Sequence, residues 1–382
     1  MMRFLFILFI INNSIFAQKI VTPEQFGAKG DGITDDLPAL NAMTNYVRSI
    51  PIYLMPEIQL SKVYRITDTW VIGARPVDER TLFLSFFDTT HQKQFNANLA
   101  TYLTAMRMPS VIINGVGNAS IYADFNDTTK LKAAIYMCTD SRVSSTNERL
   151  TAEISNIGVY AKGYYSQGIP VRKTDAQNNQ CGIATYFVKG LKIDHVTLIG
   201  FREGRVHNSC TFMSANAIDH QRCDRGSYDI ECHASNFSML TYGACKKGME
   251  VRSSQCLFNN IYTSYCPISL HVAAPNNKFS AVYLESYNAG DGQLIIGDDP
   301  NDFNYKSKPI NGLVFELLTI VANKTDKTIG TGILWKSNAG KMTINGGEMS
   351  SVNFVYPNNP NLKVYYQNIS GLLPTAVSNK IF

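Results

Sequence analysis

Charge is scarce in this 382-residue chain and is not gathered in runs. Only 17% of the residues are charged, and the 35 Lys and Arg exceed the 30 Asp and Glu by just 5. Nucleic-acid-binding proteins carry a clustered basic face, so we expect no nucleic-acid partner. Hydrophobic residues make up 45% of the chain, which excludes a disordered protein and provides for a sizeable core.

Long apolar runs are also missing. The N-terminal run at 4–11 is far shorter than the roughly 20 residues of a membrane helix, and no later window approaches that length. The run follows Arg3 and precedes the small residue Ala17, an order typical of a cleaved signal peptide; an uncleaved anchor helix is the alternative. We therefore expect residues 1–17 to be a signal peptide, no membrane insertion, and a mature chain that is secreted or periplasmic.

Cysteine pairs of the CxxC type are absent, as are the Cys/His spacings typical of zinc sites. The eight cysteines are Cys138, Cys181, Cys210, Cys223, Cys232, Cys245, Cys256 and Cys266. Their spacing does not favour a metal site.

A repeat of about 22 residues runs through the middle of the chain. One apolar column recurs at intervals of 22, 22, 21 and 21 residues, at Val196, Ile218, Leu240, Ile261 and Val282. Such a period is typical of a solenoid, in which each repeat buries its apolar face against its neighbours. Short segments rich in branched residues, such as 191–200 and 312–320, favour strands over helices. The pattern predicts a parallel β-helix with coils about 4.8 Å apart.

Six of the cysteines follow this repeat. They form two columns of three, namely Cys223, Cys245 and Cys266, and Cys210, Cys232 and Cys256. We expect each column to be a ladder of side chains that points into the core. Two states are open: reduced cysteines that pack as small hydrophobes, or one or more disulfides, because Cα atoms one coil apart lie within the disulfide range. Cys138 and Cys181 belong to neither ladder.

Residues 26–36 read FGAKGDGITDD and are followed by apolar residues at helical spacing. The glycines permit tight turns, Asp31 and Asp35 can accept backbone N–H groups, and Thr34 can cap the helix that follows. The motif resembles that of the pectin-lyase-like superfamily, specifically its pectate-lyase-type (rhamnogalacturonase/epimerase-like) domain, found in polysaccharide lyases, family 28-like hydrolases, alginate epimerases and phage tailspikes. The resemblance implies an all-β fold: a single-stranded right-handed parallel β-helix with a short N-terminal capping helix.

The resemblance and the repeat together predict the domain organisation. We expect residues 18–50 to form the N-terminal cap of the β-helix, 51–350 to form its coils, and 351–382 to form a C-terminal cap or tail. The stretches 76–105 and 163–180 break the repeat. They are expected to be loops inserted into coils, where such folds place substrate contacts.

The residues that follow the apolar column are expected to face solvent, because side chains alternate along a strand. Thr241, Tyr262 and Tyr283 are three of them, and Glu285 lies two positions after Tyr283. Tyrosine rings, hydroxyls and carboxylates are suited to binding sugars. These four are the predicted substrate-binding residues.

Asp219, His220 and Arg222 form the densest candidate catalytic cluster. A lyase needs a base that removes a proton beside a uronate carboxyl group and a cation that stabilises the resulting charge. Arg222 or the nearby Arg225 could be either, supported by Asp219 or His220. The alternative is a charge ladder on a solvated turn. Two columns of nearby charged residues favour it, namely Arg202, Asp224 and Lys246, and Glu203, Arg225 and Lys247.

A second candidate catalytic pair, His207 and Asp229, falls in one column one coil apart. An adjacent carboxylate raises a histidine pKa and orients the ring, which suits an acid or base; a surface His–Asp pair without a catalytic role is the alternative. Asp298 and Asp299 are weak candidates for binding calcium, and turn chemistry is the alternative explanation for them. We expect no cofactor other than such a calcium ion.

The resemblance implies activity on a polysaccharide, but the signatures of known enzymes are incomplete. Residues 297–299 are similar to the paired Asp of family 28 hydrolases, whereas their Asn-Thr-Asp and Gly-His-Gly signatures are missing. The Asp-Pro-His-Glu of alginate epimerases is also missing, and the Asp-His pairs at 194–195 and 219–220 lack the Trp of pectate lyases. We expect an exported lyase or hydrolase that acts on an acidic glycan along the parallel-sheet face. The alternative is a non-catalytic glycan-binding, adhesin-like or tailspike-like β-solenoid.

Overall fold

The computed structural model describes residues 19–50, 56–73, 110–126, 132–139, 150–166, 169–170, 180–286, 293–298, 309–322, 330–337, 339–350, 352–355 and 361–371. The predicted signal peptide and the expected loop at 76–105 lie outside these residues. No helix within the described ranges is long and apolar enough to cross a membrane.

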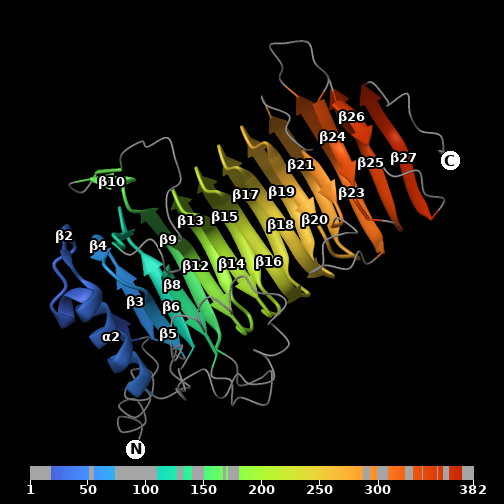
Figure 1. The fold of residues 1–382 in the computed structure, drawn as a ribbon. Coiled ribbons are helices and arrows are strands. Elements are labelled where there is room, and N and C mark those ends of the chain that lie inside the picture. Colours follow the sequence, from blue (N-terminus) through green and yellow to red (C-terminus); the bar gives the residue numbers. More distant parts are fainter. Residues whose placement is uncertain are drawn as a thin grey trace, which may run out of the picture.

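The described chain folds as a right-handed parallel β-helix built from two long parallel sheets, here called sheet A and sheet B (Figure 1). Sheet A contains β1 (Ile20–Val21), β2 (Asp31–Asp35), β3 (Glu57–Leu60), β4 (Val63–Ile66), β6 (Val111–Gly115), β7 (Ser120–Ala123), β9 (Ala152–Ala161), β13 (Lys192–Ile199), β15 (Ser214–Gln221), β17 (Asn236–Gly243), β19 (Leu257–Ser264), β21 (Lys278–Ser286), β23 (Ile310–Ala322), β25 (Gly340–Ser350) and β27 (Leu362–Gly371). Sheet B contains β5 (Trp70–Gly73), β8 (Lys132–Cys138), β12 (Gln180–Tyr186), β14 (Glu203–Asn208), β16 (Arg225–His233), β18 (Lys247–Ser254), β20 (Ile268–Val272), β22 (Leu294–Ile296), β24 (Gly330–Trp335) and β26 (Val352–Val355). The chain passes alternately between the sheets, so the predicted fold class is confirmed.

The apolar column predicted from the repeat forms the inner face of sheet A. Val196, Ile218, Leu240, Ile261 and Val282 are direct partners in successive strands, and each is almost completely buried. Four phenylalanines stack beside this column with ring centroids 4.6–4.8 Å apart, namely Phe237, Phe258, Phe279 and Phe315. The repeat predicted this core because an insertion-free coil returns each residue type to the same face.

The cysteine ladders lie in the core as expected. All eight cysteines are buried and carry free thiols. The thiols of Cys223 and Cys266 both lie within hydrogen-bonding distance of the Cys245 thiol, as one coil of spacing allows. Cys138 and Cys181, which neither ladder contains, lie on the outer face of sheet B beside Tyr136 and Tyr186.

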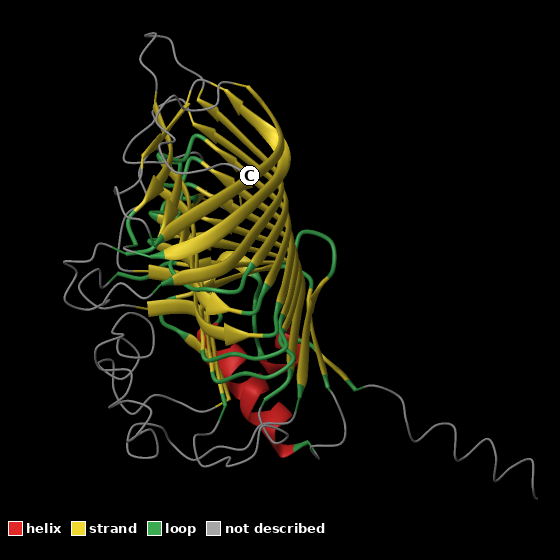
Figure 2. Ribbon diagram, turned by 90° about the vertical axis from the view of Figure 1, so that its right-hand side faces the viewer, coloured by secondary structure: helices red, strands yellow, loops and turns green. Residues whose placement is uncertain are grey.

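The N-terminal end of the solenoid is covered by the helix α2 (Leu37–Ser49), which follows the short 3-10 helix η1 (Pro23–Phe26) (Figure 2). The prediction that Thr34 caps α2 is wrong, because the helix begins three residues later and Asp36 is its N-cap. The Asp36 carboxylate accepts hydrogen bonds from the backbone N–H of Lys29 and Gly30, at 2.7 and 3.0 Å. It therefore closes the glycine-rich turn back onto the start of the helix.

Each central strand of sheet A contains one residue with a positive φ at the same place in the coil. These residues are His195, Ala217, Met239, Asn260, Ala281 and Leu317, with φ between 51° and 56°. The bend divides the outer face of the sheet into two polar strips. The strip after the bend holds the predicted substrate-binding residues.

Two predicted boundaries can be compared with the fold. Part of the expected loop at 163–180 forms a separate antiparallel hairpin of β10 (Tyr165–Ser166) and β11 (Ile169–Pro170), outside both long sheets. At the other end, β26 and β27 pair in parallel with β24 and β25. The segment 351–382, expected to be a cap or tail, thus contributes two strands to the β-helix.

Candidate functional site

Thr241, Tyr262 and Tyr283 lie side by side on the outer face of sheet A, in strands β17, β19 and β21. Their neighbours in sequence point inward, so strand alternation turns these three side chains to solvent. The rings of Tyr262 and Tyr283 stack with centroids 5.4 Å apart and planes 16° from parallel. The Tyr262 hydroxyl donates a hydrogen bond of 3.1 Å to Glu285 Oε2. The structure thus brings the four predicted substrate-binding residues together.

Asp219 extends this row by one coil. Its Oδ1 accepts hydrogen bonds from Thr241 Oγ1 at 2.6 Å and from Gln221 Nε2 at 2.8 Å. The Tyr262 ring is 42% exposed, which leaves an aromatic surface open beside these polar groups. Partial burial and the Glu285 carboxylate raise the pKa of Tyr262, so its hydroxyl stays a neutral donor. We call Asp219, Thr241, Tyr262, Tyr283 and Glu285 the tyrosine row.

The predicted catalytic cluster of Asp219, His220 and Arg222 is divided by the fold. His220 follows Asp219 in the strand and therefore points into the core, where it is completely buried. Its Nδ1 donates to the carbonyl of Thr241 at 3.1 Å, and its ring stacks on Tyr242 at 4.5 Å. Burial, with the charge of Arg205, lowers the pKa of His220 well below its usual value. Asp219 and Arg222 are the two members of the cluster at the surface, and Arg222 lies in the turn after β15 with φ 54°.

His207 and Asp229 are partners in β14 and β16, as the repeat predicted, but neither is at the surface. His207 Nδ1 lies 2.7 Å from Thr185 Oγ1, while Asp229 Oδ2 faces Arg205 Nη2 at 3.4 Å. The expectation that Asp229 raises the histidine pKa is wrong. Burial, Arg205 and His220 lower the pKa of His207 well below its usual value, because the carboxylate is turned toward the arginine.

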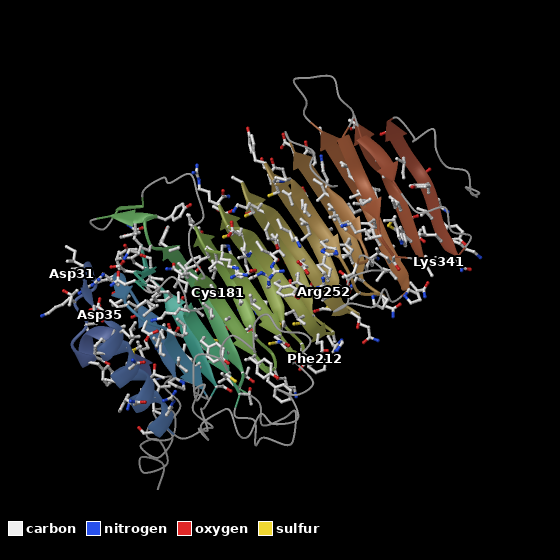
Figure 3. All side chains as sticks on the ribbon, in the orientation of Figure 1. Asp31, Asp35, Cys181, Phe212, Arg252 and Lys341 are labelled. Atoms are coloured by element: carbon white, nitrogen blue, oxygen red, sulfur yellow. The ribbon has the colours of Figure 1, made fainter. Side chains whose placement is uncertain are left out.

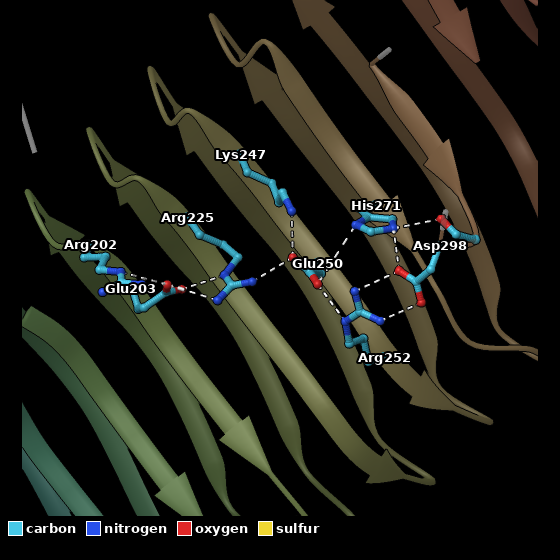
Figure 4. A network of polar contacts seen from close by, with 9 residues as sticks. Arg202, Glu203, Arg225, Lys247, Glu250, Arg252, His271 and Asp298 are labelled. Atoms are coloured by element: carbon cyan, nitrogen blue, oxygen red, sulfur yellow. Dashed lines mark hydrogen bonds and ion pairs between the residues drawn. The ribbon is translucent and has the colours of Figure 1, made fainter. Parts of the chain in front are cut away.

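The outer face of sheet B carries a chain of ion pairs that the sequence predicted only in part (Figure 4). Arg225 binds Glu203 through Nε at 2.6 Å and Glu250 through Nη1 at 2.7 Å. Glu250 forms two further ion pairs, with Lys247 Nζ 2.8 Å from its Oε2 and Arg252 Nε 2.7 Å from its Oε1. The charge column of Glu203, Arg225 and Lys247 is confirmed by the register. Glu250 and Arg252 were missed, although they stand two residues apart in β18, the spacing of one strand face.

Glu250 is the centre of this network. Burial favours its protonated form, but Arg225, His271, Arg252 and Lys247 outweigh burial and hold its pKa well below the usual range. The network therefore contains a carboxylate that is ionised at neutral pH, with each oxygen already bonded to a cation. Such an arrangement stabilises the sheet, and it leaves Glu250 unsuited to accept a proton in catalysis.

Asp298, a predicted calcium ligand, is part of the same network. Arg252 Nη1 and Nη2 bind its two carboxylate oxygens at 2.7 and 2.8 Å, a bidentate geometry (Figure 4). Figure 3 shows where Arg252 lies in the whole molecule. Asp299 lies outside the described residues. Within the described ranges, no group of three or more His, Cys, Asp or Glu side chains has the arrangement of a metal site.

No protein-family model matches the chain, and no curated protein does. Several solved structures resemble it. The Geobacillus virus E2 ORF18 protein has a TM-score of 0.58 at 11% identity, over 92% of this chain and 62% of that protein. Tailspike protein 3 of bacteriophage CBA120 has a TM-score of 0.49 at 12% identity, over 92% of this chain and 56% of the tailspike chain. The family 28 exopolygalacturonase of Yersinia enterocolitica has a TM-score of 0.47 at 10% identity, over 94% of this chain and 76% of the enzyme chain.

The chain therefore spans less than two thirds of the length of the two viral proteins. At these identities the likeness shows the shared fold alone.

Proposed function

We propose that this protein binds a polysaccharide along the outer face of sheet A, with Tyr262 and Tyr283 as the stacking surface. The observation that carries the proposal is the near-parallel stack of the exposed Tyr262 ring on the half-buried Tyr283 ring, flanked by Thr241 and Glu285. Sugar rings pack their apolar faces against aromatic rings, and their hydroxyls exchange hydrogen bonds with carboxylates and hydroxyls at the rim.

The row also fits a linear ligand. Its members repeat with the coil spacing of about 4.8 Å, which is close to the length of one sugar unit in an extended chain. The same column continues through Thr319 and Glu348 in β23 and β25. A glycan aligned with the solenoid axis would therefore meet a polar or aromatic side chain at each successive coil.

Acidic glycans are the class we propose first. The turn that follows the row holds Arg202, Arg222 and Lys246 in three successive coils, and the side chains of Arg202 and Lys246 are 40% and 76% exposed. Lys246 Nζ pairs with Asp224 at 2.6 Å and Arg202 Nε lies 3.9 Å from Glu203, so these cations would meet carboxylate groups of a bound chain while sharing their charge with protein acids. Cleavage of that chain stays a prediction from the sequence, with Asp219 and Arg222 as the residues predicted to take part in it.

The test is a binding and turnover screen of the purified protein against pectic, alginate and neutral glycans. We expect saturable binding to at least one acidic glycan, weakened by salt because the cations at the turn are exposed. A lyase would also release an unsaturated product that absorbs in the ultraviolet, and a hydrolase would release reducing ends without that absorbance. Absence of binding to every glycan in the screen would contradict the proposal.

A further inference from the structure

A polar cluster crosses the interior of the β-helix behind the Asp219 and Thr241 end of the tyrosine row. Sheet B contributes Arg205, His207 and Asp229, and sheet A contributes His220 and Tyr242. All five side chains are completely buried in a largely apolar lumen, to which the coils on either side add the buried hydroxyls of Thr185 and Thr263. The cluster therefore requires its own internal hydrogen bonding.

Some of these groups are paired. Arg205 Nη2 lies 3.4 Å from Asp229 Oδ2, and the guanidinium also contacts the Tyr242 hydroxyl. The ring of Phe237 lies 5.2 Å from the guanidinium carbon, and Ser227 Oγ lies 2.8 Å from the Tyr242 oxygen. The arginine and the aspartate offset one another's charge.

Other buried atoms of the same cluster have no hydrogen-bond partner among the protein atoms. They are Arg205 Nε, Arg205 Nη1, His207 Nε2, His220 Nε2 and Asp229 Oδ1. The two arginine nitrogens can only donate, and the Asp229 oxygen accepts. His220 Nδ1 donates to a carbonyl, so in the neutral ring Nε2 is an acceptor. The cluster thus presents both donors and acceptors that no single protein group satisfies.

We propose that ordered water occupies the lumen between β14, β15 and β16, hydrogen-bonded to Arg205, His207, His220 and Asp229. A water molecule both donates and accepts, which matches the mixed character of these atoms. An anion fits less well, because Asp229 already offsets Arg205 and burial keeps both histidines uncharged. The water completes a bridge between the two sheets at the coils that hold the tyrosine row.

The direct test is a high-resolution crystal structure of the unmodified protein. We expect solvent density within about 2.7–3.2 Å of at least three of the five unpartnered atoms. Direct contact between Arg205 and His220, with no solvent density in the lumen, would overturn the inference. This result does not depend on any glycan, so it can fail while the proposed function holds.

A second measurement uses water-oxygen relaxation, which counts long-lived internal waters in solution. The double variant Arg205→Met with Asp229→Leu replaces both charges with apolar groups of similar size, and we expect it to hold fewer such waters than the unmodified protein. Ser254→Ala, a change at a half-buried position at the end of β18, is the control and should leave the number unchanged. An equal number of long-lived waters in the double variant would contradict the proposed site.

Discussion

At the scale of single residues, Glu250 shows how burial and charge are balanced on sheet B. Its carboxylate is 2% exposed and bonded to Arg225, Lys247 and Arg252. Removing one partner of a buried ion pair leaves the charge of the other partner buried without compensation, which destabilises the folded state by roughly 3–5 kcal/mol. We expect Glu250→Gln to lower the free energy of unfolding by about that amount in denaturant titrations at pH 7. The exposed Glu231→Gln, in the neighbouring strand β16, should change it by less than about 0.5 kcal/mol.

The same residue predicts a pH dependence. The cations hold the folded-state pKa of Glu250 well below that of the unfolded chain, about 4.3. Its contribution to stability is therefore fully present above that value and is lost as the pH falls toward the folded-state pKa. Denaturant titrations between pH 7 and 3 should show the difference between the unmodified protein and Glu250→Gln shrinking below about pH 4. A difference that stays constant over this range would mean that Glu250 is not the titrating group.

At the scale of elements, the bend in the strands of sheet A is built from residues that disfavour it. Met239 adopts φ 52° and its side chain is exposed, whereas Asn156, Asn260 and Asn368 occupy the same place in other coils. Asparagine tolerates the left-handed region better than other L-residues with a Cβ. We expect Met239→Asn to raise the free energy of unfolding by about 0.5–1 kcal/mol.

Met239→Ala is the control that removes the exposed methionine side chain without improving the fit to the positive φ. Alanine, unlike asparagine, does not tolerate the left-handed region better than methionine does. Thermal or denaturant unfolding should show a gain for the asparagine variant alone. Equal stability of the two variants would show that the positive φ at the bend carries no cost.

The elements also show what the sequence could predict. Val196 and its column were found because the repeat keeps sheet A in register. Arg205 could not be assigned to a face in the same way, because β14 does not alternate regularly at Gly204. Glu203 joins the outer ion-pair network, yet Arg205, two residues later, contacts Phe237 inside the lumen. A one-residue change of phase reverses every later side chain of the strand. Glycine recurs at this step in successive coils, at Gly182, Gly204, Gly226 and Gly248, and a glycine inside a strand often marks such an irregularity.

That change of phase explains which of the predicted site residues lie on the outer surface. The tyrosine row lies in sheet A, where alternation is regular up to and after the bend, and its four predicted residues lie together. His207 and Asp229 lie in sheet B after the irregular step, and they are buried instead of exposed. His220 was misassigned for a simpler reason, since it is the immediate neighbour of the outward-facing Asp219.

At the scale of the whole molecule, the cysteine ladders determine the chemistry of the core. Burial raises the pKa of Cys256 to about 12, and all eight thiols are buried. Because the thiolate is the reactive form, we expect no rapid reaction with a thiol reagent in the native state and eight reacting groups after unfolding without reductant. Tyr265→Cys, at an exposed turn position, is the control that should react at once. Fewer than eight groups after unfolding would reveal a disulfide within a ladder.

The central claim is that the tyrosine row binds glycan, and the most direct measurement is calorimetric affinity of a Tyr262→Ala variant for the glycan that binds best in the screen. Loss of the stacking ring should weaken binding by roughly 1–1.5 kcal/mol, about tenfold in the dissociation constant. Phe212→Ala removes a ring that is 60% exposed but lies in the turn before β15, at the opposite end of the strand from the turn that follows the row, so its affinity should match that of the unmodified protein. Unchanged affinity of the Tyr262→Ala variant would contradict the account.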